Sequence, residues 1–358
     1  MSPGPGSVPA MEPMTVVASE AHRAHDPPYE VNFGKVVQPV WERVARAELL
    51  REALVAAGHP VTGPREHGLG PLRAVHQPAL LEFLERAWAE WRAAHGPRAA
   101  LIPDTFALPG LGSGRARPSA GGVGRPGWFC FDTATPLVQG SWPAARAAAD
   151  LALTGADLVA EGAPAAYALC RPPGHHAGPG YYGGFCLLNN AAVAARALAR
   201  LGRVAVVDVD FHHGNGTQDV FWEDPAVLYV SLHGDPAVHY PYFTGAADET
   251  GGGRAAGTNR NLPLPDGTGD DAYLDALERA LQPVAAFAPE VLVVSLGVDT
   301  FGEDPIGGFA LGRAAYPRIG RLLAGLSLPT LFVQEGGYAL DALADCVGGV
   351  LAGFQAAC

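Results

Sequence analysis

The sequence lacks several features that identify other classes of protein. No apolar run reaches the roughly 18 residues that a membrane-spanning helix needs. The N-terminal stretch MSPGPGSVPAMEPM has neither the basic start nor the apolar core of a secretion signal. The five cysteines are widely spaced and form no CxxC pair, so neither a disulfide framework nor a thiolate zinc site is indicated. We therefore expect a cytoplasmic protein with no membrane partner.

Basic residues are also scarce. The chain has 24 Lys and Arg residues against 36 Asp and Glu, a formal net charge of -12, and Lys35 is its single lysine. No basic run could neutralise a phosphate backbone, so we expect no nucleic-acid partner. The negative charge instead favours the approach of a cationic ligand.

The 358 residues are 48% hydrophobic and 17% charged, which is enough apolar material for a large core. Continuous apolar runs predict strands buried on both faces. These runs are AAYALC (165–170), VAVVDVD (204–210), AVLYVSLH (226–233), EVLVVSLGVD (290–299) and PTLFVQEGG (329–337). Helix-like segments at 188–201, 270–288 and 314–327 alternate with them. This alternation predicts an α/β fold around a parallel sheet.

The distribution of Pro and Gly suggests the domain organisation. Residues 1–13 are predicted to be a disordered tail, and 14–358 a single domain. Residues 103–135, again rich in Pro and Gly, are predicted to be a loop insertion within that domain.

Polar residues follow most of the predicted strands, where open parallel sheets bind their ligands. In VDVDFHHGNGTQD (206–218), an extended chain would turn Asp208, Asp210 and His212 to one side and Phe211 to the other. Asp and His are zinc ligands, and a site with three protein ligands leaves room for a water and a substrate. Another strand end supplies Asp299. The sequence therefore predicts a catalytic metal site.

Several motifs together carry a family resemblance. They are RPPGHHA, GGFCLLNNAAVAA, VDVDFHHGNGTQDVFW, VSLHGDP, SLGVDTFGEDP and EGGY. Over roughly residues 15–355 the chain resembles the zinc-dependent histone deacetylase family, and most closely its bacterial acetylpolyamine amidohydrolase branch. The resemblance implies the arginase-deacetylase α/β fold, a three-layer structure with a central parallel sheet of about eight strands flanked by helices. It also implies a hydrolase that uses metal-activated water to remove acyl groups, above all acetyl, from small amines.

The resemblance assigns roles around the metal. The ligands would be Asp210, His212 and Asp299, holding Zn²⁺, with Fe²⁺, Co²⁺ or Mn²⁺ as alternatives. His176 would be the general base and acid, and His175 its electrostatic partner. The remaining catalytic positions are Asp208, which would hold His175, Asn215, which would hold His176, and Tyr338, which would hydrogen-bond the substrate carbonyl.

The resemblance also describes the surroundings of the metal. Gly184, Phe185 and Tyr240 would form a slot for the alkyl chain, and Glu30 would face a cationic substrate. The insertion positions that would add further acids are Val123 and Ala134, and the acids nearby are Asp104 and Asp132. A structural K⁺ would lie at Asp208, Asp210, His212, Ser231 and Leu232. The insertion 103–135 would close a homodimer.

Three other functions share some of these features. An arginase-like ureohydrolase needs two metals, and the HHA pair and Tyr338 favour a deacetylase over it. A non-catalytic binding protein would be expected to lack a ligand, the histidine pair or the tyrosine, and all are here. A protein-lysine (histone-like) deacetylase is the main alternative. The small acylated amine could be an acetylpolyamine or an acyl-lysine-like amide.

Overall fold

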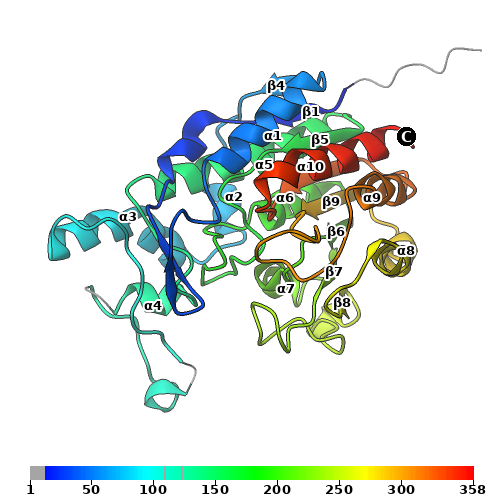
Figure 1. Ribbon diagram of the computed structural model, residues 1–358. Coiled ribbons are helices and arrows are strands. Elements are labelled where there is room, and N and C mark those ends of the chain that lie inside the picture. The colour runs from blue at the N-terminus through cyan, green and yellow to red at the C-terminus, as the bar shows by residue number, and fades with distance from the viewer. Residues whose placement is uncertain (1–12, 109, 122–123) are drawn as a thin grey trace, which may run out of the picture.

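The computed structural model describes residues 13–108, 110–121 and 124–358. At its centre lies a sheet of eight parallel strands in the order β4-β1-β5-β10-β9-β6-β7-β8 (Figure 1). The strands are β1 (Thr15–Val17), β4 (Val61–Thr62), β5 (Ala165–Ala168), β6 (Val204–Asp208), β7 (Val227–Gly234), β8 (Asn259–Leu264), β9 (Val291–Leu296) and β10 (Thr330–Gln334). A separate antiparallel hairpin joins β2 (Glu30–Asn32) and β3 (Lys35–Val37).

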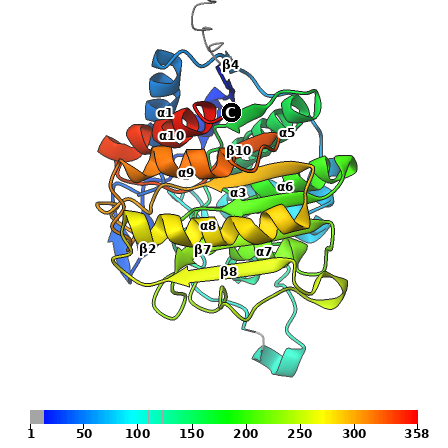
Figure 2. The ribbon, with the colours of Figure 1, turned by 90° about the vertical axis from the view of Figure 1, so that its right-hand side faces the viewer.

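Helices cover both faces of the sheet, which gives three layers (Figure 2). One face packs against α1 (Ala45–Ala56), α8 (Asp270–Phe287), α9 (Ala315–Ala324) and α10 (Leu340–Gln355). The other face packs against α3 (Pro78–His95), α5 (Ser141–Ala160), α6 (Asn190–Leu198) and α7 (Asn215–Phe221). Short helical turns complete the chain: η1 (Glu20–Ala24), α2 (Gly70–Arg73), η2 (Leu111–Gly114), α4 (Pro126–Phe129), η3 (Ala199–Leu201) and η4 (Gly253–Ala255).

Alternation along β6 explains why its sequence is continuously apolar. Val204 and Val206 enter the core beneath α5 and α6, while Ala205 and Val207 enter the core beneath α8 and α9. Side chains on successive strand residues point to opposite faces, and here both faces are buried. The predicted three-layer α/β fold with a parallel eight-stranded sheet is confirmed.

The predicted elements differ from the structure mainly at their ends. Strand β6 ends at Asp208, so Asp210 and His212 lie in the following turn and not on a continued strand. The helix expected over 188–201 is α6 followed by the turn η3. No helix of the described residues is long and apolar enough to cross a membrane.

Backbone hydrogen bonds join the two chain segments that flank residues 103–135. Leu101 and Leu137 exchange backbone hydrogen bonds of 2.8 and 2.9 Å. Further out, the Ala107 amide donates to the Gly127 carbonyl at 2.9 Å. Figure 1 shows the segment extending from the body of the molecule as an arm that carries η2 and α4. The predicted disordered tail lies outside the described residues, apart from Pro13.

Candidate active site

The predicted site residues lie at the carboxyl ends of neighbouring strands. His175 and His176 follow β5, Asp210 and His212 follow β6, and Asp299 follows β9. Tyr338 follows β10, which lies between β5 and β9 in the sheet. Parallel strands end at the same edge, so these residues meet although they are far apart in the sequence.

Asp210, His212 and Asp299 form a buried cluster whose ligand atoms all lie within 4.8 Å of one another. His212 Nδ1 lies 2.9 Å from Asp299 Oδ2. Burial and the charge of Asp210 raise the pKa of Asp299 to about 7. Burial lowers the pKa of His212, but the two carboxylates outweigh it and raise that pKa to about 9. Histidine and carboxyl ligands release their protons when a metal binds. Asp210, His212 and Asp299 therefore fit a divalent cation.

Two glycines leave room for the cluster. A Cβ at Gly297 would lie 1.9 Å from Asp210 Oδ2, closer than any side chain tolerates. A Cβ at Gly336 would lie 2.5 Å from the same oxygen and 2.6 Å from Asp299 Oδ2. The Gly336 amide also donates to Asp210 Oδ2 at 2.8 Å. Both glycines are therefore required by the close approach of the two carboxylates.

The two histidines beside the cluster have different partners and opposite pKa shifts. His175 Nδ1 donates to Asp208 Oδ2 at 3.0 Å. Burial lowers the pKa of His175, but Asp210 and Asp208 outweigh it and raise the pKa well above its ordinary value. His176 Nδ1 lies 2.7 Å from Asn215 Oδ1. Burial, together with the neighbouring His175 and His212, lowers the pKa of His176 well below its ordinary value.

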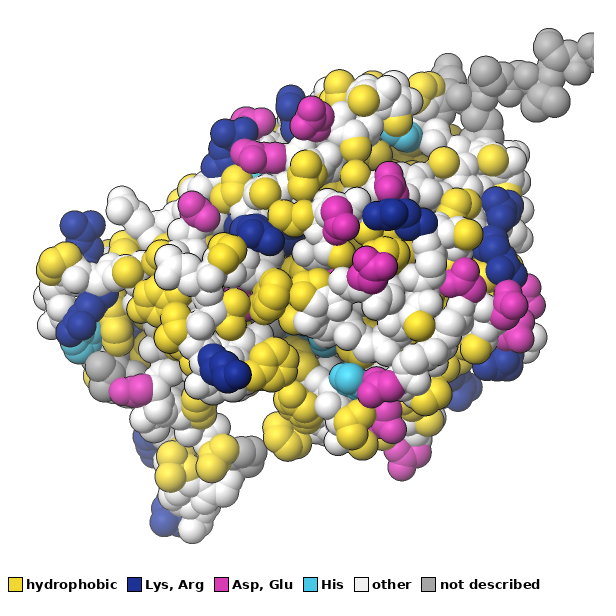
Figure 3. Space-filling model, viewed as in Figure 1, with side chains coloured by type: hydrophobic (Ala, Val, Ile, Leu, Met, Phe, Trp, Pro, Cys, Tyr) yellow, Lys and Arg dark blue, Asp and Glu magenta, His cyan; other side chains and the backbone are white. Residues whose placement is uncertain are grey.

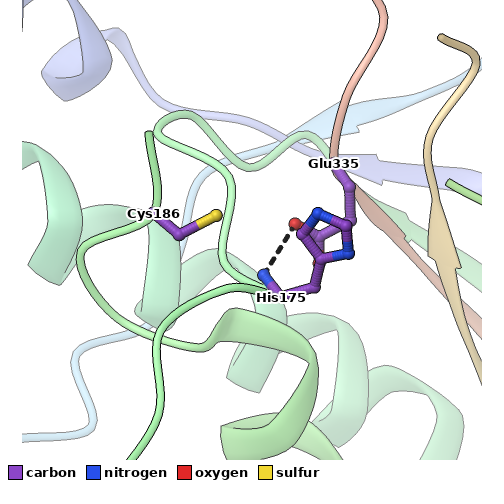
Figure 4. Close-up of side chains that lie close together, drawn as sticks. All are labelled: His175, Cys186 and Glu335. Atoms are coloured by element: carbon purple, nitrogen blue, oxygen red, sulfur yellow. Dashed lines mark hydrogen bonds between the residues drawn. The ribbon is translucent and has the colours of Figure 1, made fainter. Parts of the chain in front are cut away.

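Glu335, whose role the sequence did not indicate, holds the loop that carries this pair. Its Oε2 accepts the amide of Gly174 at 2.6 Å and the amide of His175 at 3.1 Å, and Figure 4 shows the second of these bonds. Burial raises the pKa of Glu335 to about 7. Cys186 lies on the other side of His175, and its thiol donates to the Gly184 carbonyl at 3.2 Å. Glu335 and Cys186 therefore both have hydrogen-bond partners. They lie on either side of the loop that carries His175 and His176.

Tyr338 is buried and fixed from several directions. Asp304 Oδ2 accepts its amide at 2.7 Å, and the Arg46 guanidinium lies 4.6 Å from its ring centre. Arg46 also donates to the Gly337 carbonyl at 2.7 Å and pairs with Glu42 at 2.9 Å. The roles of Arg46 and Asp304 could not be inferred from the sequence. The only signal for Asp304 was its place in the GEDP motif, and Arg46 lies on α1 outside every motif.

A cavity of about 980 Å³ opens over these groups and reaches the surface shown in Figure 3. His176, His212 and Tyr338 line it, together with the predicted slot residues Gly184, Phe185 and Tyr240. Phe185 has a φ of +66°, which is unusual for a residue other than glycine, and its amide donates to Thr135 Oγ1 at 2.8 Å. Strained backbone of this kind is concentrated at functional sites.

Asp132, at the base of the arm, connects three parts of the slot. Its Oδ2 accepts the Gly184 amide at 2.6 Å and the Tyr240 hydroxyl at 2.8 Å. Its Oδ1 accepts the amides of Ala134 and Thr135 at 3.0 and 3.1 Å. The carboxylate therefore positions both walls of the slot, a role that the sequence alone did not reveal.

Of the acids expected near the substrate, Asp132 lines the cavity, whereas Glu30 and Asp104 do not. Glu30 is not among the lining residues, and its side chain is buried, with the residue 1% exposed. Its Oε1 has no hydrogen-bond partner among the described residues. Asp104 is exposed and does not line the cavity, whereas Ala134 does. Val123 lies outside the described residues.

The residues predicted to hold K⁺ surround the end of β6. Asp208 and Ser231 are paired across β6 and β7, and Leu232 follows on β7. Asp208 Oδ2 accepts the Tyr229 hydroxyl at 3.0 Å, and the Ser231 hydroxyl lies 2.8 Å from His233 Nδ1. A fully buried carboxylate beside a second one, Asp210, suits a monovalent cation.

The family model of the histone deacetylase domain matches residues 35–354. The chain belongs to the histone deacetylase family. It is 45% identical over 348 residues to acetylpolyamine amidohydrolase 1 of Pseudomonas aeruginosa, covering 96% of this chain and 99% of that relative. It is 43% identical over 343 residues to the acetylpolyamine amidohydrolase of Mycoplana ramosa, covering 95% and 99%.

A solved structure supports the same family membership. The acetylpolyamine aminohydrolase from Burkholderia pseudomallei superposes with a TM-score of 0.91 at 40% identity, covering 96% of this chain and 99% of that one. The predicted family, its arginase-deacetylase fold and the enzyme class, a deacetylase acting on amides, are confirmed. The roles of individual residues stay predictions.

Proposed function

We propose that this histone deacetylase family member is a zinc-dependent hydrolase that removes acetyl groups from small amines. One observation supports this above the others. His212, which clusters with Asp210 and Asp299, lines the same cavity as His176 and Tyr338, so the groups that amide hydrolysis requires can act on a single substrate.

Asp210, His212 and Asp299 would hold a divalent ion, Zn²⁺ with Fe²⁺, Co²⁺ or Mn²⁺ as alternatives, which would supply the Lewis acid for polarising the amide carbonyl and activating water. The protein residues supply the proton transfer. The low pKa of His176 keeps its imidazole neutral, and donation from Nδ1 to Asn215 leaves Nε2 free to accept a proton from water. His176 then returns that proton to the departing amine.

Tyr338 and His175 stabilise the charges that develop. The Tyr338 hydroxyl stays protonated, because burial raises its pKa well above the ordinary value, and it donates to the carbonyl oxygen as negative charge grows there. His175, hydrogen-bonded to Asp208, carries a positive charge beside His176. That charge disfavours a second proton on His176 and so keeps the base ready.

The finer features of the proposal come from the relatives and the sequence. Acetylpolyamines and acyl-lysine-like amides would be the two substrate classes, Asp208 and Ser231 would help to hold K⁺, and the arm 103–135 would close a homodimer over the cavity mouth. A cytoplasmic location stays a prediction from the sequence. Sedimentation of the purified protein tests the dimer, and a monomeric mass at full activity would contradict it.

The decisive experiment is a turnover screen of the zinc-loaded protein. Acetylputrescine, acetylspermidine, acetyl-lysine peptides and an acetylated folded histone are compared by release of acetate. We expect kcat/KM to be higher for the small amides than for the histone. A preference for the folded histone would favour the protein-lysine deacetylase alternative.

A further inference from the structure

The outer part of the active-site cavity is lined by exposed apolar side chains. Phe33 at the tip of the β2–β3 hairpin is 74% exposed, Val238 is 62% exposed and Phe243 is 95% exposed. Leu108 of the arm and Tyr242 line the same region. Figure 3 shows hydrophobic side chains gathered in the middle of this face. Such a patch, continuous with a deep pocket, is typical of a ligand-binding surface.

Negative charge is nearly absent from this wall. Asp132 is the only acid among the described lining residues, and none of those residues is Lys or Arg. Both Asp132 oxygens already accept hydrogen bonds, from Gly184 and Tyr240 on one side and from Ala134 and Thr135 on the other. A substrate ammonium could pair with Asp132 only by displacing the donors that shape the slot.

Neither the hairpin nor the arm brings another acid to the wall. Glu30 is buried and does not line the cavity, whereas its neighbours Val31 and Asn32 do. The segment 103–135 contains the acids Asp104 and Asp132 against three arginines, Arg115, Arg117 and Arg125. A second copy that closed the mouth with this arm would therefore add more positive than negative charge.

From this lining we propose that the preferred substrate is an acetylated amine whose distal end is uncharged and apolar or aromatic, in preference to a polyamine. The inference rests on the proposed function and specifies the substrate class of the same site. A distal ammonium in this cavity loses water without gaining a carboxylate partner. A distal phenyl or alkyl group instead gains contact with the aromatic wall. The net charge of -12 attracts cations to the molecule as a whole but provides no partner inside the cavity.

Three acetamides that differ at the distal end of the alkyl chain test the proposal: N-acetylputrescine, N-pentylacetamide and N-(4-phenylbutyl)acetamide. We expect kcat/KM of the zinc-loaded protein to be at least about 10-fold higher for the phenylbutyl compound than for acetylputrescine, with the pentyl compound between them. Equal values, or a preference for acetylputrescine, would overturn the inference while leaving the deacetylase function intact. Cleavage of none of the three would refute the proposed function, and the inference with it.

A matched pair of variants tests the charge argument directly. Val238→Glu adds an acid to the outer wall, and Val238→Gln adds a side chain of the same size without charge. The ratio of kcat/KM for acetylputrescine to that for N-pentylacetamide should rise about 3-fold in Val238→Glu and stay unchanged in Val238→Gln. A ratio that does not move in Val238→Glu, or that rises equally in both variants, would refute the role of the missing charge.

Discussion

Replacing Glu30, whose side chain is buried, should change how the stability of the folded protein depends on pH. Burial raises the pKa of Glu30 from 4.5 to about 8, and the neighbouring Glu42 and Asp132 add to that effect. Between these two pH values the folded protein keeps a proton that the unfolded chain has released. The stability associated with this proton is full below pH 4.5 and is lost as the pH rises to 8. Over 3.5 pH units, at about 1.4 kcal/mol per unit, the loss is about 5 kcal/mol.

Glu30→Gln removes the titration, so its free energy of unfolding should rise relative to wild type as the pH increases. Urea unfolding of both proteins at pH 5, 6, 7, 8 and 9 measures this difference, which should grow by about 1.4 kcal/mol per unit up to pH 8 and then level off. The exposed Glu52→Gln on α1 is the control, and its difference should not change with pH. A constant difference for Glu30→Gln would refute the buried acid.

The kinetics of Glu30→Gln distinguish a buried acid from an acid that faces the substrate. If Glu30 faced the substrate, Glu30→Gln would raise KM selectively for amides with a distal ammonium, as the sequence led us to expect. Because Glu30 is not on the cavity wall, we expect the same KM ratio for charged and neutral acetamides as in wild type. A selective rise in KM would return Glu30 to the substrate site.

Three further predictions concern the catalytic groups. Asp210→Ala should lose the one tightly bound divalent ion per chain, as measured by metal analysis. Chelation of the wild type should abolish acetate release. An active preparation without bound metal would contradict the assignment of the metal site. His176→Ala and Tyr338→Phe should each lower kcat at least about 100-fold with unchanged metal content, and near-normal turnover in either would refute its role. Asp132→Asn should lower kcat/KM about 10-fold, because the amide presents one acceptor oxygen in place of two. Tyr240→Phe removes a single donor to Asp132 and should lower kcat/KM by less. Equal and negligible effects of the two substitutions on kcat/KM would argue against the positioning role of Asp132.

The sequence predicted the central strands well because they are buried on both faces. It missed β1, β4 and β8 of the main sheet for two reasons. β1 and β4 are three and two residues long, too short to form a distinct apolar run. The edge strand β8, NRNLPL, is only partly buried and carries polar side chains. Apolarity identifies strands at the centre of the sheet far better than strands at its edges.

The candidate site divides in the same way. Asp210, His212, Asp299 and the histidine pair stand in motifs next to predicted strands, so their convergence could be inferred from the topology. Asp132 and Arg46 could not be inferred, because each acts through contacts with residues more than 50 positions away and neither follows a strand of the sheet. The burial of Glu30 depends on how the hairpin packs, which no local pattern records.

The backbone hydrogen bond between Ala107 and Gly127 has a consequence for how this protein can change over evolution. It closes the arm before the chain reaches Asp132, so the positions that define the slot lie on the inner side of the closure. Insertions, deletions or replacements between 110 and 121 can accumulate while the geometry around Tyr240 and Gly184 is kept. The tip can therefore diversify, or be exchanged by an engineer, independently of the chemistry beneath it.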